Sequence, residues 1–282
     1  MNKRNIIYIV ITAICVISVI TAIFYQVSKS NKGKNNSSTQ NTITDGQANQ
    51  TLDLEALKEE FNNIFDNSFD DQGYDTTAIK KISGLEDKEL VYSAYTIKDQ
   101  KDGKYDIELN LPVFNVDGEV ASSLNAITQS VFANKANDIL TNTNVYTIYK
   151  IDYKAYLNDN ILSLIIKSTL KEGNNAERLI VQTYNYDVTT GKIVTLNDVL
   201  QNSNIQLKDV DAKIEKVVTE ANKQAEAVSS AVGQNIYKRD INNAMYVTDN
   251  VGYFFIGEYD QIYILYPYGN SNFTSEIDIV KV

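Results

Sequence analysis

Histidine is absent from the 282-residue chain, and cysteine occurs once, as Cys15. Without histidine the chain cannot form a Ser-His-Asp or Cys-His catalytic group, a histidine-containing zinc site or a histidine general base. A single cysteine cannot form a disulfide within the chain. We therefore expect a protein that is not an enzyme and that holds neither a metal nor a cofactor.

Basic residues are fewer than acidic ones and are unevenly placed. Residues 1–34 contain five Lys or Arg and no acid, so residues 35–282 hold 21 basic and 36 acidic residues, a net charge of −15. Nucleic-acid affinity comes largely from Lys and Arg that neutralise phosphates, so we expect no nucleic-acid partner. The acidity favours solubility first and a cationic partner second.

One long apolar run lies near the start. Residues 6–25 (IIYIVITAICVISVITAIFY) carry no charge over 20 residues, about the length of helix that spans a bilayer core. Lys3 and Arg4 favour a cytoplasmic tail of residues 1–5, with the remaining chain outside the cell. A cleaved signal peptide ending near Ser28 or Ser30 is the alternative, but its apolar region is normally only about 7 to 15 residues long. We therefore predict a single-pass membrane protein.

The composition changes after the apolar run. Residues 26–50 are rich in Ser, Asn, Lys, Thr and Gln and have almost nothing to bury, so we expect a disordered linker there. The folded extracellular domain is expected over residues 51–282.

Apolar residues in that domain recur at both helical and strand spacing. Apolar stripes predict three amphipathic helices, the second of them from Val120, Leu124, Ile127, Val131, Ile139 and Leu140. Short connections such as Asp102-Gly103 favour antiparallel hairpins, and Pro112 indicates an edge or a strand end. The fold class is thus α+β, an antiparallel sheet with about three helices. The predicted helices cover residues 52–67, 119–141 and 207–229, and the predicted strands cover residues 90–97, 105–113, 145–157, 161–170, 179–188, 192–196, 245–248, 252–257, 262–268 and 277–280.

Sequence patterns for known chemical sites do not fit. Aligning Gly73 with the invariant glycine of a calcium loop places Ile79 where glutamate is required. Gly191-Lys192 lacks the upstream glycine and the following Ser or Thr of a phosphate loop. Paired carboxylates could serve a glycosidase only if they shared one cleft, which a sequence does not show. A carboxylate hydrolase is therefore the third hypothesis.

Tyrosine occurs 19 times, which is enough to supply both a core and a surface. Most of these rings suit half-buried strands, while those near predicted loops suit an interface, because the ring packs and the hydroxyl finds a partner. The candidate binding residues are therefore Tyr259, Asp260, Tyr266 and Tyr268.

Residues 184–200 (YNYDVTTGKIVTLNDVL) resemble the signature of the RsiV-type extracellular domain family, with an aromatic-Asp strand, a TGK turn and a TL.D segment in that order. Residues 253–280 are similar to the end of that domain. Residues 51–142 hold a segment similar to its usual upstream companion, and residues 143–282 hold the signature. The resemblance implies an α+β domain outside the cell.

In membrane-bound anti-sigma factors this domain senses lysozyme by binding it, and a similar domain precedes peptidoglycan deacetylase domains. Five residues before the apolar run are too few for a sigma-factor-binding domain, and the chain lacks the histidine ligands of the deacetylase. The first hypothesis is therefore a cell-surface binding protein of a Gram-positive bacterium that engages lysozyme or another cationic cell-wall enzyme. The second is a module that binds peptidoglycan.

Overall fold

The computed structural model describes residues 52–233, 236–270 and 273–282. Residues 52–228 and 235–282 form one compact unit, and of the second unit, residues 1–51 and 229–234, only the end of a helix is described. The predicted cytoplasmic tail, transmembrane helix and linker lie outside the described residues. Within the described ranges, no helix is both long and apolar enough to cross a membrane.

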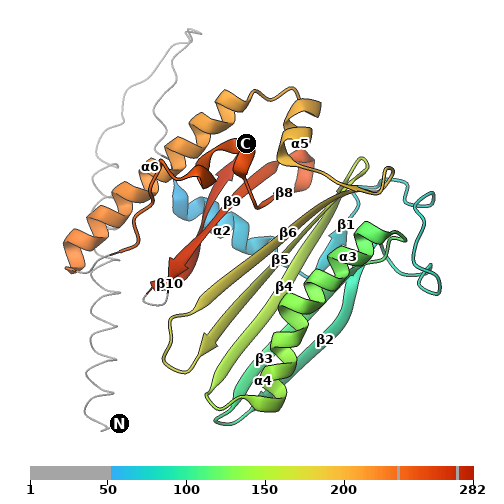
Figure 1. The fold of residues 1–282 in the computed structure, drawn as a ribbon, viewed down its shortest axis with the longest axis horizontal. Helices are drawn as coiled ribbons and strands as arrows, with labels where there is room; N and C mark the ends of the chain where they lie inside the picture. The colour runs from blue at the N-terminus through green and yellow to red at the C-terminus, as the bar shows by residue number, and fades with distance from the viewer. Residues whose placement is uncertain (1–51, 234–235, 271–272) are drawn as a thin grey trace, which may run out of the picture. The chain divides into compact units, whose positions relative to one another are not determined.

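A mixed seven-stranded sheet forms the larger part of the compact unit (Figure 1). The antiparallel pairs β2-β3, β4-β5, β5-β6 and β6-β7 confirm the predicted hairpins. However, β3 and β1 both run parallel to β4, so the prediction of a purely antiparallel sheet is wrong. The reason is that a helix crosses over between β3 and β4, and parallel neighbours need such a crossover. The strands are β1 Ser68–Asp70, β2 Val91–Lys101, β3 Tyr105–Phe114, β4 Thr147–Asn158, β5 Ile161–Glu172, β6 Arg178–Asp187 and β7 Lys192–Ile193.

Two strands share one edge of β4. β3 pairs with the first half of β4 and β1 with the second half. Between them, Asn67 has a positive φ of 56° and exchanges hydrogen bonds of 3.0 and 3.1 Å with the backbone of Tyr153. Pro112 lies in the part of β3 that has left β4, opposite Ser93. This position confirms its predicted place near a strand end. Proline has no N–H to donate, and at this position β3 forms no hydrogen bond with β4.

One continuous helical segment runs along a face of the large sheet (Figure 1). It comprises α3 Glu119–Thr128, a π-helical turn η1 Gln129–Ala133 and α4 Asn134–Asn142, which confirms the helix predicted over residues 119–141. The predicted stripe is wrong at Ile127 and Val131, which are 44% and 40% exposed.

The side chains that this helix buries include Leu124, Thr128, Phe132 and Ala136, at successive spacings of four. With 3.6 residues per turn, a spacing of four drifts around an α-helix. A π turn contains more residues per turn and so keeps these positions on one face. The π turn therefore turns Phe132 inward and Val131 outward.

A three-stranded antiparallel sheet of order β10-β9-β8 packs on the other face of the large sheet (Figure 1). Its outer face packs against helices α5 and α6, so the unit is layered as helix, large sheet, small sheet and helix. The helix predicted over residues 207–229 is confirmed as α6. The elements are α5 Leu196–Asn202, α6 Leu207–Val232, β8 Phe254–Ile256, β9 Ile262–Asn270 and β10 Phe273–Lys281.

Polar side chains join the two sheets through the backbone of β8 and of Gly257, which follows it. Asn185 Nδ2 donates to the Phe254 carbonyl at 2.9 Å, and the Ile256 N–H donates to Ser163 Oγ at 3.2 Å. Asn158 Nδ2 donates to the Gly257 carbonyl at 3.1 Å. These buried groups are satisfied only when the sheets meet in this register, so they specify how the layers align.

One predicted strand is wrong and a second is shorter than predicted, because side chains cap helical turns there. Residues 245–248 form short turns, η2 Ala244–Tyr246 and η3 Thr248–Asn250, and Asn243 Oδ1 accepts from the Met245 N–H at 3.0 Å. Residues 192–196 give only the short β7, because Thr195 starts α5. Its backbone N–H donates to Asp198 Oδ2 at 2.8 Å, and its hydroxyl accepts from the Asp198 N–H at 3.2 Å. This capping box was present in the sequence as Thr-Leu-Asn-Asp.

Helix α2, Leu54–Asn63, confirms the first predicted helix over a shorter range. Asp53 begins it by accepting a hydrogen bond from the Ala56 N–H at 3.0 Å. Phe61 is buried between the two sheets, near the ring of Phe255. The helix therefore closes one side of the layered core.

The TGK segment forms the turn from β6 to β7. The Asp187 carboxylate accepts from the N–H groups of Thr189 and Thr190 at 2.8 and 2.9 Å, and Gly191 has a φ of 70°. A left-handed residue of this kind favours glycine. The TGK segment thus has a local role in forming this turn.

Candidate functional site

The turn between β8 and β9 holds a tyrosine ring out into solvent. Tyr259 is 87% exposed, and both Tyr259 and Asp260 have positive φ values, 54° and 58°. The turn is closed by a 2.8 Å hydrogen bond from the Gly257 N–H to the Gln261 carbonyl. Left-handed backbone costs about 1–2 kcal/mol for each residue that has a Cβ, and such strain concentrates at functional sites. We therefore build the candidate site around this turn.

Glu258, the residue before Tyr259, lines a hollow of about 350 Å³. The hollow is bounded by α2 and the residues after it, by β4 and by β9, so the fold brings together segments about 200 residues apart. Three of its lining residues are acidic and one is basic. The lining residues are Glu60, Asn63, Ile64, Asp66, Lys154, Tyr156, Glu258 and Tyr263.

Two of the three carboxylates already have cationic partners. Lys281 Nζ lies 2.7 Å from Glu60 Oε1, and this ammonium together with the Tyr263 hydroxyl lowers the pKa of Glu60. Burial raises the pKa of Asp66, but hydrogen bonds from Ser68 and Lys154 outweigh it, so the pKa is lowered. Both groups therefore stay ionised at neutral pH.

Glu258 differs from these two because no ion pair to another described residue holds its carboxylate. Its carboxylate lines a hollow in which the other two carboxylates each have a lysine partner. A cationic group that entered the hollow would give Glu258 a partner of opposite charge and form charge-assisted hydrogen bonds.

Lys154 and Ser68 also lie close together beside the hollow. Lys154 Nζ donates to Ser68 Oγ at 2.6 Å and lies 3.2 Å from Asp66, while the Ser68 hydroxyl donates to Asp66 at 2.6 Å. A Ser-Lys nucleophile needs a neutral amine that accepts the serine proton. Here the proton points to Asp66 instead, so the trio stabilises the pairing of β1 with β4.

No group of three or more metal-ligating side chains occurs among the residues that the structure describes.

The predicted site residues fall in three different environments. Tyr259 and Asp260 lie together in the exposed turn. Tyr266 is only 3% exposed, and its ring packs 4.9 Å from the ring of Tyr246 in the core under α6. Tyr266 is therefore part of the core and presents no surface to a partner.

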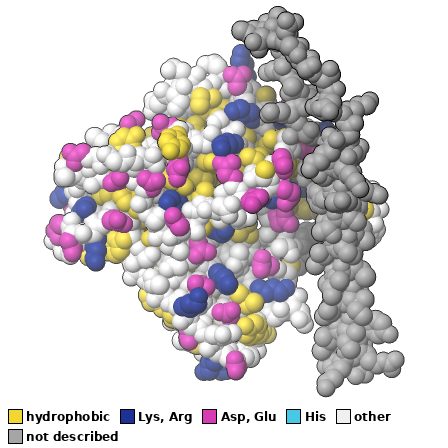
Figure 2. Space-filling model, turned by 180° about the vertical axis from the view of Figure 1, so that it is seen from behind, with side chains coloured by type: hydrophobic (Ala, Val, Ile, Leu, Met, Phe, Trp, Pro, Cys, Tyr) yellow, Lys and Arg dark blue, Asp and Glu magenta, His cyan; other side chains and the backbone are white. Residues whose placement is uncertain are grey.

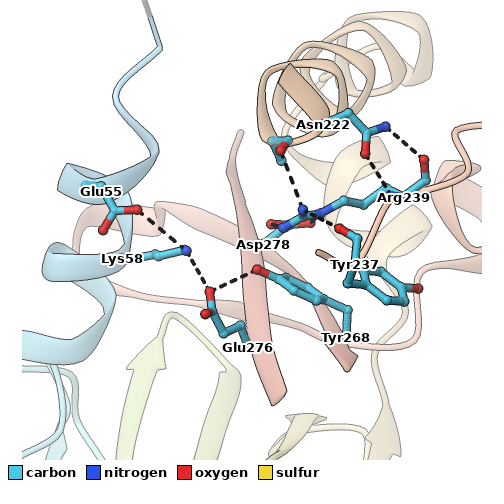
Figure 3. A network of polar contacts seen from close by, with 9 residues as sticks. Glu55, Lys58, Asn222, Tyr237, Arg239, Tyr268, Glu276 and Asp278 are labelled. Atoms are coloured by element: carbon cyan, nitrogen blue, oxygen red, sulfur yellow. Dashed lines mark hydrogen bonds and ion pairs between the residues drawn. The ribbon is translucent and has the colours of Figure 1, made fainter. Parts of the chain in front are cut away.

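Tyr268 belongs to a polar network at the far end of β9 (Figure 3). Its ring stacks on Tyr237 at 5.2 Å and lies 4.1 Å from the Arg239 guanidinium, and its hydroxyl donates to Glu276 at 2.9 Å. Burial, with the neighbouring carboxylates of Asp278 and Glu276, raises the pKa of this phenol, so the hydroxyl remains a donor. Tyr268 is thus engaged within the domain.

The same network joins helices α2 and α6 to strands β9 and β10. Arg239 forms two 2.8 Å hydrogen bonds with Asp278 on β10, and Asn222 on α6 bonds the Arg239 backbone (Figure 3). Lys58 on α2 reaches Glu276 at 2.9 Å. These contacts hold helices against the sheet, and we assign the network a structural role.

The carboxylates Glu60, Asp66 and Glu258 were missed from the sequence as members of one site. In the sequence, only Tyr259 and Asp260, which follow Glu258, pointed to this region, because a tyrosine near a predicted loop suits an interface. The sequence does not distinguish these carboxylates from the other acidic residues of the domain. Only the packing of α2 beside β4 could identify these three.

No family model and no curated protein sequence matches the chain. Among solved structures, the chain is similar to a DUF3298 family protein from Pseudomonas aeruginosa, with 12% identity and a TM-score of 0.38, covering 64% of this chain and 84% of that one. It is also similar to a member of the DUF3298 family from Bacteroides fragilis, with 14% identity and a TM-score of 0.34, covering 63% and 80%. These are distant structural similarities to DUF3298 family proteins.

Proposed function

We propose that this chain is a membrane-anchored extracellular binding domain, and that the Tyr259 turn with its acidic hollow contacts a cationic protein such as lysozyme or a related cell-wall enzyme. The observation that carries the proposal is the 87% exposed Tyr259, held on strained backbone between Glu258 and Asp260. An exposed aromatic ring beside carboxylates suits a partner that presents an apolar surface with Lys or Arg beside it.

The distribution of charge suggests that the whole domain attracts a basic protein and that the site selects it. Residues 35–282 have a net charge of −15, which speeds the approach of a basic protein. On the face in Figure 2, acidic and basic side chains are interspersed. The net negative charge of the domain therefore does not by itself direct a basic protein to one part of this face. Selectivity then depends on local contacts, and the hollow offers space for a Lys or Arg side chain next to Glu258.

Anchoring is the second part of the proposal. Residues 6–25 serve as the membrane anchor with residues 1–5 in the cytoplasm, and residues 26–50 serve as the tether. A flexible chain of that length has a mean end-to-end distance of about 25–30 Å. That reach keeps the domain near the membrane while it binds a diffusing enzyme.

The test is calorimetric titration of the full-length chain in detergent with lysozyme, at low salt and at about 0.15 M salt. We expect lysozyme to bind at both salt concentrations, and a different basic protein of similar size to bind only at low salt. Tyr259→Ala should weaken lysozyme binding about tenfold, and Glu258→Gln should weaken it less. Tyr146→Ala removes a ring that is 39% exposed outside the site and serves as the control.

Equal binding of lysozyme and the control protein, or equal loss from Tyr259→Ala and Tyr146→Ala, would contradict this function. Salt-insensitive retention on purified cell wall without lysozyme binding would favour the peptidoglycan-binding module instead.

A further inference from the structure

A second, larger hollow lies on the opposite face of the large sheet. It is a groove of about 710 Å³ between the β2-β3 edge of the sheet and the helical segment α3-η1-α4. The acidic hollow lies on the other face, where Tyr156 packs toward the small sheet. The two sites share no lining residue, so each can be tested alone.

None of the 15 residues that line this groove carries a charge. The acidic hollow, by contrast, is lined by three carboxylates. A charged ligand would lose hydration in the groove without meeting an opposite charge, which is unfavourable. The lining therefore suits a neutral ligand.

Side-chain amides without a partner lie along the helical wall. Gln129, Asn134 and Asn137 are exposed, and none of them forms a side-chain hydrogen bond with another described residue. Asn125 is different, because its amide bonds both the N–H and the carbonyl of Phe114 at 2.8 and 2.9 Å. Three amides are thus available as donors and acceptors to a ligand.

The opposite wall supplies an aromatic ring. Tyr95 is 46% exposed and lies where the pairing of β2 with β3 shifts, between Ser93 and Tyr95. Bulges of this kind reorient side chains near binding sites. The facing wall includes Gln129 and Ala133, the first and last residues of the π turn, and such turns often mark functional sites.

We propose that this groove binds a neutral oligosaccharide of N-acetylated hexosamines. Sugar hydroxyls and acetamido groups pair with the three amides, and the C–H face of a sugar ring packs on the electron-rich face of Tyr95. Between these walls, Leu111, Pro112 and Ala133 give apolar contact for an acetamido methyl group. This proposal does not depend on the acidic hollow.

The test uses ligand-observed NMR of the full-length chain in detergent with the tetramer of N-acetylglucosamine. The tetramer of glucosamine and tetragalacturonate are the cationic and anionic controls. We expect saturation by the neutral tetramer alone, with an affinity that does not change with salt.

Tyr95→Ala and Asn137→Ala should each weaken binding of the neutral tetramer about tenfold, with the melting temperature unchanged because both side chains are exposed. Tyr146→Ala, which removes a ring outside the groove, should bind as the wild type does. No saturation at millimolar tetramer, equal binding of all three oligosaccharides, or binding that Tyr95→Ala and Asn137→Ala leave unchanged would overturn the proposal. If no sugar binds, a peptide segment would be the alternative ligand of the groove.

Discussion

Arg239 and Asp278 form a bidentate ion pair with two hydrogen bonds of 2.8 Å, and their side chains are only 5% and 2% exposed. The pair joins the segment after α6 to β10, and the Arg239 backbone is bonded in turn to Asn222 on α6. Arg suits this position because its planar guanidinium both pairs with Asp278 and stacks on Tyr268.

Removing one member of this pair should destabilise the domain strongly. Asp278→Asn leaves the Arg239 charge buried without its counter-ion, and we expect a loss of about 3–5 kcal/mol in the free energy of unfolding. Urea unfolding followed by circular dichroism measures it. Glu108→Gln, which breaks the exposed pair with Lys98, is the control and should cost far less. Equal losses in the two variants would show that the buried pair has no special role.

The π turn predicts opposite results for two adjacent residues. Phe132 is fully buried and Val131 is 40% exposed. Phe132→Ala should lower the free energy of unfolding by about 3–5 kcal/mol, because it leaves a cavity in the core. Val131→Ala should change it by less than about 0.5 kcal/mol. The reverse order, measured by the same urea unfolding, would mean that the helix continues without the π turn.

Acid should weaken the contacts of α2 with the strands beside it. The pKa of Glu60 is lowered in the folded state by Lys281 and Tyr263. A lowered folded pKa gives stability that is present above the unfolded value, about 4.3 for glutamate, and is lost as the pH falls through the folded value. We therefore expect Glu60→Gln to be less stable than the wild type at pH 7, with the difference shrinking below about pH 4.

Thermal unfolding of both proteins across this pH range measures that difference. A difference that stays constant with pH would show that Glu60 acts through packing instead of charge. Glu59→Gln, on the same helix, controls for a general effect of removing a carboxylate from α2.

The membrane anchor predicts a mass. Because the apolar run is longer than the apolar region of a signal peptide, we expect the membrane-bound protein to keep it. Mass spectrometry of the protein extracted from membranes should then give the mass of the full chain, 31.7 kDa. Release of a soluble protein that lacks the residues before about Ser30 would identify a cleaved signal peptide.

Local patterns in the sequence were sufficient for the elements that bury one regular face. The apolar stripe of α6 and the alternation of Ile107, Leu109 and Leu111 on β3 both predicted the correct element, because helical and strand periodicities depend only on neighbours in the chain. The turn glycines Gly103 and Gly191 have the positive φ values that such turns require.

Long-range packing decided the rest. The parallel pairing of β3 and β1 with β4 depends on where the crossover helix and Asn67 place the chain, and that placement is not visible as a local pattern. In the helix after β3, buried contacts selected Phe132 over Val131, which the α-helical period had favoured. At the candidate site, the sequence alone indicated the loop tyrosine Tyr259. The structure shows that Tyr266, another predicted binding residue, is buried.

The sequence by itself excluded sites that need histidine and a disulfide within the chain, and it gave the net charge and the apolar run. These properties follow from composition and residue order alone. Only the tertiary structure decided that Glu60, Asp66 and Glu258 share one hollow and that an uncharged groove lies on the opposite face. Such sites are built from residues that are distant in sequence and become neighbours only when the layers pack. A binding surface is a property of that packing, and for this reason the sequence could supply its residue types but not its location.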